Sequence, residues 1–327
     1  MNDLILFVSF AVLSLIQASM LVGVLFIGLK WAKLQDVSRK STWSTGLFIG
    51  FTQIAMQMVP WFLGLNRNLQ MTVILLSVVA YPVLVLKLRF EIGVGKAIKA
   101  SIPAIVLFPL LGFLLVNQLF KPYFYEAYTM STNSMAPTIR GGHITAKCQH
   151  CEEPSIISVD PGDKRADLEN CICERFHYST YHENDFSSIK PELGDSVLVS
   201  KLKTPKRWDI IIFDNPHGNS EVYAFRLVGL PGESVQIKGG AVFIDEQELV
   251  PPAELQGIRY ESDLRFNRWA GDKPAQLTDG EYFVLGDNTR KAYDSRGFRT
   301  GFAIPEDSVH GVVTHRYWPF DRWHSFP

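Results

Sequence analysis

The chain has 327 residues, of which 47% are hydrophobic and 20% are charged, and its formal net charge is -1 at pH 7. This length allows more than one folded unit, and the near-zero charge with scattered basic residues argues against a nucleic-acid partner. The apolar residues are concentrated in the first 120 positions. We therefore expect two parts, a membrane domain over residues 1–120 and a second domain over residues 121–327.

Four apolar runs in the first part are each close to the roughly 20 residues that a helix needs to cross a bilayer. The first run is too long for a removable signal peptide, and it lacks the basic start and the small-residue cleavage site of one. Gln53, Gln57 and Pro82 interrupt the second and third runs, for which a buried helical hairpin is the alternative. The four runs, predicted as transmembrane helices, are residues 4–29, 46–63, 71–86 and 102–119.

Basic residues between the runs predict the orientation of the helices. Two of the predicted loops are rich in Lys and Arg, whereas the loop between them has only Arg67 and the N-terminus has none. Because such basic loops stay on the cytoplasmic side, we expect the N-terminus and everything after the fourth run to lie on the extracytoplasmic side of the cell membrane. The basic residues are Lys30, Lys33, Arg39 and Lys40 in the first loop, and Lys87, Arg89, Lys96 and Lys99 in the second.

A compact polar turn follows the last apolar run, with the sequence Ser-Thr-Asn-Ser-Met-Ala-Pro-Thr over residues 131–138. A serine between small polar residues, followed by Met-x-Pro-Thr, can present one hydroxyl at the edge of a sheet. That hydroxyl belongs to Ser134. The predicted orientation puts this turn close to the outer surface of the bilayer.

Residues 143–193 are predicted to form an insertion that carries all four cysteines in two close pairs, about twenty residues apart. This spacing suits a tetrahedral Zn²⁺ site made of four thiolates. The alternative is disulfides between the two pairs, because the extracytoplasmic side is oxidising. His150 and His177 lie nearby and are expected to have surface roles, and the insertion is expected to be structural. The cysteines are Cys148, Cys151, Cys171 and Cys173.

From Gly194 onward the sequence is typical of strands, with short β-branched or aromatic runs that Gly, Pro, Asn or Asp mostly bound. Pro231-Gly232 and Lys238-Gly239-Gly240 signal tight turns, and the second predicts a hairpin. No long amphipathic helix interrupts the runs, so we expect an all-β domain of mostly antiparallel, coiled sheets after the helical bundle. The predicted strands are residues 196–200, 210–213, 222–228, 234–237, 241–244 and 282–285.

Three segments stand in the order and spacing of one family: the Ser134 turn, the stretch from Tyr223 to Gly232, and the stretch Gly-Asp-Asn-Thr-Arg-Lys-Ala-Tyr-Asp-Ser-Arg that begins at Gly286. Together they resemble the conserved boxes of type I signal peptidases, the membrane-anchored Ser/Lys proteases that cut leader peptides. The resemblance implies an extracytoplasmic β domain, no cofactor for catalysis, and signal peptides of exported preproteins as substrates.

The resemblance also implies roles for single residues. Ser134 matches the nucleophile, and the hydroxyl of Thr132, together with the Ser134 backbone N–H, matches the oxyanion hole. Met135 lies beside the site, where substrate binds. Three further matching residues are expected to support the fold, the first two as a buried ion pair. They are Asp287, Arg296 and Arg226.

The match fails at the general base. The family's second box reads Tyr-x-Lys-Arg-x-x-Gly-x-Pro-Gly, and this chain reads Tyr-Ala-Phe-Arg-Leu-Val-Gly-Leu-Pro-Gly from Tyr223. Phe225 therefore occupies the position of the uncharged lysine that takes the serine proton, and a phenyl ring accepts no proton. In the third box, Ala292 occupies the position of the serine that orients this lysine.

These two substitutions predict impaired Lys-dependent catalysis. His143, His150 and His217 are expected in loops, and His217 is the least implausible replacement base. The first hypothesis is a leader-peptide endopeptidase with reduced activity. The alternative is an inactive pseudoprotease that binds signal peptides or another membrane protein, for which four helices offer extra surface. A transporter or receptor would need polar residues inside the spans, and few are present.

Overall fold

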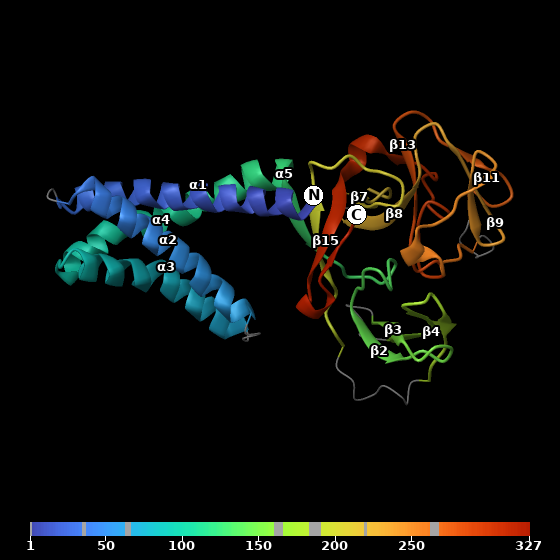
Figure 1. The fold of residues 1–327 in the computed structure, drawn as a ribbon, viewed down its shortest axis with the longest axis horizontal. Helices are drawn as coiled ribbons and strands as arrows, with labels where there is room; N and C mark the ends of the chain where they lie inside the picture. Colours follow the sequence, from blue (N-terminus) through green and yellow to red (C-terminus); the bar gives the residue numbers. More distant parts are fainter. Residues whose placement is uncertain are drawn as a thin grey trace. The chain divides into compact units, whose positions relative to one another are not determined.

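The computed structural model describes residues 2–34, 37–62, 67–159, 166–182, 191–218, 221–261 and 268–327. The chain divides into two compact units, Met1–Pro122 and Tyr123–Pro327. The first unit is helical and the second is made of antiparallel sheets (Figure 1), so the predicted fold class is confirmed.

Within its described residues, the first unit contains four long helices. Three segments are long and apolar enough to cross a membrane, namely Asp3–Trp31, Asn68–Arg89 and Val94–Tyr123, whereas the described part of the second helix is not among them. The helices are α1 (Asn2–Trp31), α2 (Arg39–Phe62), α3 (Arg67–Arg89) and α4 (Val94–Leu114), which continues as a π-helical turn (Leu115–Phe120) and α5 (Lys121–Tyr123).

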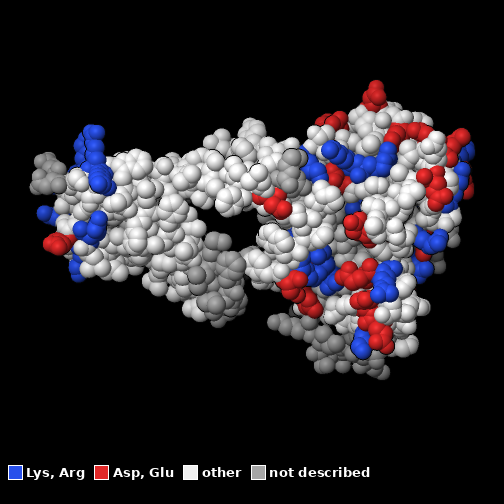
Figure 2. Space-filling view, viewed as in Figure 1, with Lys and Arg blue, Asp and Glu red and all other residues white. Residues whose placement is uncertain are grey.

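Small residues and a few polar contacts hold these helices together. A Cβ atom at Gly28 of α1 would lie 1.9 Å from the backbone oxygen of Ala100 in α4, so only glycine fits this close approach. The Gln53 side chain of α2 donates to the backbone oxygen of Ser77 in α3 at 2.7 Å. Figure 2 shows that Lys and Arg gather at one end of the visible face of this unit, and the rest of that face is nearly free of them.

The described part of the second unit contains an eight-stranded antiparallel sheet with the order β1-β6-β15-β7-β8-β13-β14, and β16 pairs with β15. The sheet brings together strands from both ends of the unit. The turn after β1 therefore follows a strand of the sheet whose other strands come from later in the chain. The strands are β1 (Tyr125–Thr129), β6 (Ser196–Ser200), β7 (Ile210–Asp214), β8 (Val222–Gly229), β13 (Glu281–Leu285), β14 (Ile304–Pro305), β15 (Val309–Trp318) and β16 (His324–Ser325).

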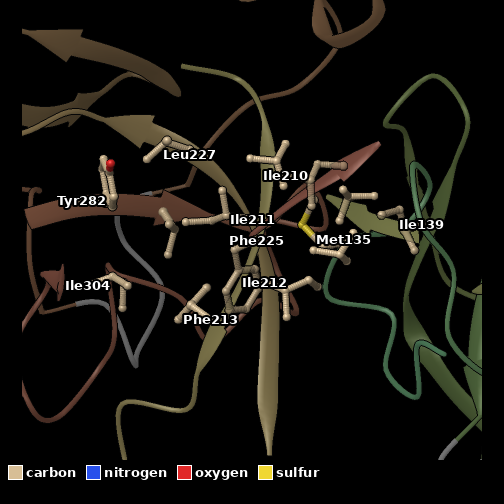
Figure 3. Packing of buried hydrophobic residues seen from close by; sticks show 14 of the residues in the cluster. Met135, Ile139, Ile210, Ile211, Ile212, Phe213, Phe225, Leu227, Tyr282 and Ile304 are labelled. Atoms are coloured by element: carbon tan, nitrogen blue, oxygen red, sulfur yellow. The ribbon is translucent and has the colours of Figure 1, made fainter. Parts of the chain in front are cut away.

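The main hydrophobic core packs on this sheet. β7 is buried from Ile210 to Phe213 without alternation, as expected for a strand covered on both faces. Figure 3 shows Met135, from the turn that carries Ser134, in the same cluster as Phe225 of β8. Because Met135 is only 3% exposed, its burial fixes the serine turn against the sheet.

A second, four-stranded sheet has the order β11-β10-β9-β12. The predicted hairpin is confirmed: Lys238 pairs with Ala241, and the two residues between them, Gly239 and Gly240, have φ values of 59° and 84°, the conformation of a type I′ turn. The strands are β9 (Ser234–Lys238), β10 (Ala241–Ile244), β11 (Gln247–Glu248) and β12 (Ala275–Gln276), and short 3₁₀ turns cover Ala253–Leu255, Glu306–Ser308 and Phe320–Arg322.

The predicted insertion forms a third antiparallel sheet with the order β2-β3-β4-β5. Residues 160–165 and 183–190 of that insertion lie outside the described residues. The strands are β2 (His143–Lys147), β3 (Pro154–Val159), β4 (Ala166–Cys173) and β5 (Tyr178–Ser179). Strand β2 starts at His143, shortly after the serine turn, so this sheet follows the candidate site closely in sequence.

Candidate active site

The serine turn joins β1 to β2, and Asn133 closes it from inside. The Asn133 side-chain oxygen accepts the Gly141 N–H at 2.9 Å, and its amide nitrogen donates to the Gly142 oxygen at 2.8 Å. Asn133 is buried, the neighbouring Ser134 is half-buried and Thr132 is exposed. One buried amide therefore holds both ends of the turn while the two candidate catalytic hydroxyls stay accessible.

A second asparagine holds the turn from the loop after β13. The Asn288 backbone N–H donates to the Ser134 oxygen at 3.0 Å, and the Asn288 side-chain nitrogen donates to the Asn133 oxygen at 3.1 Å. Thr138 also donates to Asp287 at 2.5 Å. In the sequence, Asn288 is only one residue of the third segment that resembles the family. Nothing in the sequence predicts its hydrogen bonds to the serine turn.

Gly286 is the point on which the serine turn and the two substituted positions converge. A Cβ atom built there would lie 2.2 Å from the Cβ of Ala292, 2.7 Å from the Ser134 backbone oxygen and 3.1 Å from the ring edge of Phe225. The structure therefore brings Ser134, Phe225 and Ala292 together around one glycine.

Hydrocarbon fills the space beside this glycine. Phe225 is 4% exposed and Ala292 is fully buried. The Phe225 ring centroid lies 6.1 Å from that of Phe213, 5.9 Å from that of Tyr223 and 6.4 Å from that of Phe298. Aromatic pairs at these separations stabilise one another, so Phe225 is an integral member of the core (Figure 3).

A groove of about 260 Å³ runs past the serine. Thr132, Ser134, Met135 and Phe225 all contribute to its lining, so four of the predicted site residues share one surface. The other lining residues are Tyr128, Thr129, Met130, Ser131, Glu221, Val222, Tyr223, Ala224, Lys291 and Tyr293. Sequence reasoning missed Lys291, although it directly precedes Ala292.

Lys291 is held by a carboxylate. Its Nζ lies 2.7 Å from Asp167 Oδ2 on β4. Burial raises the pKa of Asp167, but the hydrogen bond and the charge of Lys291 outweigh it, so the pKa is lowered overall. The ammonium group of Lys291 is therefore already paired with a carboxylate.

The three histidines considered as replacement bases, His143, His150 and His217, do not line the groove, since no histidine is among its described lining residues. His217 is exposed and stacks on Tyr293, with ring centroids 5.4 Å apart. His143 lies in strand β2, not in a loop, because its backbone pairs with Ser158 of β3. Its Nδ1 lies 2.8 Å from the Gly141 oxygen. Burial lowers the pKa of His143. His150 Nε2 meets the Tyr178 oxygen at 3.1 Å.

The predicted ion pair between Asp287 and Arg296 is wrong, although both residues are buried. Asp287 accepts two hydrogen bonds from Arg226 of β8, at 2.7 and 2.5 Å, because Asp287 closely follows β13, the strand that pairs with β8. Burial lowers the pKa of Arg226, but Asp287 more than offsets this and raises it. Arg296 turns back to Asp294, two residues earlier, at 2.8 Å.

The cysteines also differ from the predicted set. The sulfur atoms of Cys148, Cys151 and Cys173 lie within 4.8 Å of one another and of a His177 ring nitrogen. Cys171 points elsewhere, into a hydrophobic cluster, and its Sγ donates to the Asp167 oxygen at 3.4 Å. All four thiols are free. Burial raises the pKa of Cys148, but hydrogen bonds from the His150 N–H and other donors lower it to about 6.

Comparisons with known proteins point to one family. Residues 171–318 match the model of the family described as signal peptidase, peptidase S26. The chain is 33% identical over 144 residues to signal peptidase I of Bacillus licheniformis, which covers 42% of this chain and 75% of that protein. It is 32% identical over 142 residues to signal peptidase I U of Bacillus subtilis, covering 41% and 73%.

Two further matches cover different shares. Signal peptidase I of Leptolyngbya laminosa is 33% identical over 143 residues, or 40% of this chain, and the chain spans 64% of the length of that relative. A crystal structure of a signal peptidase I from Enterococcus faecalis is 32% identical and covers 34% of this chain and 98% of that one, with a TM-score of 0.28.

Proposed function

Because the chain belongs to the signal peptidase I family, we propose that it is a membrane serine endopeptidase acting on the signal peptides of exported preproteins, with impaired Lys-dependent cleavage. The observation that carries the proposal is the convergence of Ser134, Phe225 and Ala292 on Gly286 beside one groove. The nucleophile position is kept, while the position of its base is filled with hydrocarbon.

The chemistry follows from these residues. A serine hydroxyl is a poor nucleophile until a base takes its proton. Ser134 would attack the scissile carbonyl, and the Thr132 hydroxyl with the Ser134 N–H would stabilise the oxyanion. Without a base at position 225, only oxyanion stabilisation and binding remain, which lowers the rate on the order of 10⁴-fold or more.

The second candidate is a pseudoprotease that binds signal peptides or a membrane partner without cutting. The packing of Phe225 favours it. The Phe225 ring is a core residue in contact with three other aromatic rings, so the position of the base is filled by a well-packed side chain and is not an empty site. The ion pair of Lys291 with Asp167 favours it as well, since the lysine in the groove already has a partner.

We also propose a multi-pass arrangement in the cell membrane, with the N-terminus and the second unit extracytoplasmic. Three apolar segments long enough to span support it, and α2 is proposed as the fourth crossing, because both ends lie on one side only when the number of crossings is even. The basic residues at the ends of α1 and α3 and at the starts of α2 and α4 support the same arrangement. The gathering of Lys and Arg at one end of the unit (Figure 2) fits the positive-inside rule.

The test is cleavage of a preprotein with an Ala-x-Ala leader by the full chain purified in detergent. We would compare the wild type with Ser134→Ala and with the double variant Phe225→Lys/Ala292→Ser. A lysine at position 225 would sit among apolar groups, which lower its pKa and leave it neutral enough to act as a base. We therefore expect very slow cleavage by the wild type and at least a 100-fold gain in the double variant.

Three other results would change the conclusion. Rapid cleavage by the wild type that Ser134→Ala abolishes would mean that a replacement base exists and that catalysis is not impaired. No cleavage by any variant, with a photo-crosslinking leader peptide still captured at the groove, would favour the pseudoprotease. Neither cleavage nor capture would contradict both candidates.

A further inference from the structure

The group of Cys148, Cys151, Cys173 and His177 has the dimensions of a tetrahedral metal site. The sulfur atoms of Cys151 and Cys173 are 3.7 Å apart. Two thiolates bound tetrahedrally to zinc at about 2.3 Å lie about 3.8 Å from each other, whereas a disulfide would need about 2.05 Å. We propose that these four residues bind one Zn²⁺ and that the bound ion braces the turn that carries Ser134.

The neighbouring candidates for ligands are engaged in other contacts. Cys171 is fully buried in the cluster with Ile144 and Ile157, and its sulfur donates to a backbone oxygen. His150 Nε2 is hydrogen-bonded to the Tyr178 oxygen. The site therefore has three thiolates and one imidazole, a set that structural zinc sites use.

Backbone N–H groups point at the ligand sulfurs from both sides of the site. The His150 N–H donates to Cys148 Sγ at 3.4 Å. The N–H groups of Arg175 and His177 are hydrogen-bonded to Cys173. Such donors offset the negative charge of metal-bound thiolates and fix their direction. The tight turn from Cys173 to His177 thus provides two ligands and part of their surrounding hydrogen bonds.

This ligand turn is in contact with the serine turn. Glu174, between the two ligands, forms an ion pair with Arg140, which lies shortly after the serine turn. Phe176 packs in the cluster that contains Ala136, two residues after Ser134. Polar and apolar contacts therefore link the same few residues of the ligand turn to the serine turn.

A third contact runs through Tyr178, the residue after the ligand His177. Its hydroxyl donates to Asn288 Oδ1 at 3.1 Å. Asn288 in turn donates to the backbone oxygens of Asn133 and Ser134. Zinc bound at His177 would fix the start of β5 and, through Tyr178, the asparagine that closes the serine turn.

The first measurement is the zinc content and thiol count of the full chain, purified in detergent without added chelator. The proposal predicts about one zinc per chain, and release of the metal when a thiol-modifying reagent is added. Absence of zinc, with either four free thiols or a disulfide, would overturn it. This readout does not depend on peptide cleavage, so it stands or fails separately from the proposed function.

The ligand set is tested with substituted chains. His177→Ala should weaken zinc binding on the order of 100-fold or more, and His177→Cys should restore it, because a fourth thiolate can replace the imidazole. Cys171→Ala, the matched control, should keep the wild-type metal content. Loss of zinc in Cys171→Ala but not in His177→Ala would contradict the proposed ligands.

The bracing role is tested by hydrogen exchange before and after the metal is removed with a chelator. The N–H groups of Ala136 and Asn288 donate to backbone oxygens within the serine turn, so both should exchange faster in the metal-free chain. The amide of Val242 in β10, in the second sheet, should be unchanged. Equal protection of all three amides in both forms would show that the ion does not support this turn.

Discussion

Gly286 shows how one missing side chain decides what can occupy the site. Its backbone lies so close to Ala292, Phe225 and the Ser134 oxygen that no Cβ fits. A serine at position 292 and a lysine at position 225 would therefore approach each other and the Ser134 turn across the same glycine. The hydrocarbon side chains of Phe225 and Ala292 fill this space and offer no proton acceptor there.

Substituting Gly286 should damage the fold as well as the site. Gly286→Ala would force Ala292 and the Ser134 turn to shift, and overpacking of this kind costs about 1–3 kcal/mol of the free energy of unfolding. Gly142→Ala is the control, because its Cβ would meet only the Val159 oxygen at 3.4 Å. Thermal unfolding of the two variants should give a lower midpoint for Gly286→Ala alone. Equal midpoints would show that the residues around position 286 accommodate the added methyl group without loss of stability.

At the scale of elements, the sequence predicted strands wherever an apolar run was bounded by turn residues. The six predicted strands are present, with boundaries that differ by a residue at most. The longest strand, β15, was missed because His310, His315 and Arg316 interrupt its apolar pattern. His315 is nevertheless fully buried. Only the pairing with β6 and β7, which are distant in sequence, makes this segment a strand.

The cluster of possible metal ligands differs from the predicted set of four cysteines for a related reason. Spacing along the sequence groups Cys171 with Cys173, but the tight turn after Cys173 brings back His177 instead. Cys171 belongs to the hydrophobic face of β4. Which side chains converge at the end of a strand depends on how the next turn closes, and a count of cysteines carries no information about that.

The contact between Arg226 of β8 and Asp287 after β13 joins neighbouring strands. Asp287→Asn would leave the guanidinium buried without its charged partner, which costs about 3–5 kcal/mol of the free energy of unfolding. Glu153→Gln breaks an exposed pair with Arg175, 3.2 Å long, and should cost less than about 1 kcal/mol. Chemical denaturation of both variants measures the difference. Similar losses would mean that the buried pair contributes no more than a surface pair.

At the scale of the whole molecule, the two units differ in where their apolar side chains lie. The helical unit exposes many large apolar side chains, among them Phe7, Leu75 and Phe113, which water would not tolerate but lipid would. The β unit buries its apolar residues in clusters on its sheets. A chain with this division needs a bilayer around one unit and water around the other.

The proposed orientation makes a prediction for the complete chain. Alkaline phosphatase folds to an active form only outside the cytoplasm, and green fluorescent protein is the converse reporter for the cytoplasm. Fused after Gly93, between α3 and α4, the phosphatase should be inactive and the fluorescent protein bright, because Lys87, Arg89, Lys96 and Lys99 flank that position and basic segments stay inside.

Fused after Pro327, the two reporters should give the opposite result, since one more spanning helix separates that end from the basic segment. Replacing the four flanking basic residues with glutamine is the matched control, and it should weaken the preference at both fusion points. An active phosphatase after Gly93 in the unaltered chain would reverse the proposed orientation. It would place Ser134 in the cytoplasm, where exported signal peptides are not processed, and would thereby remove the proposed substrate.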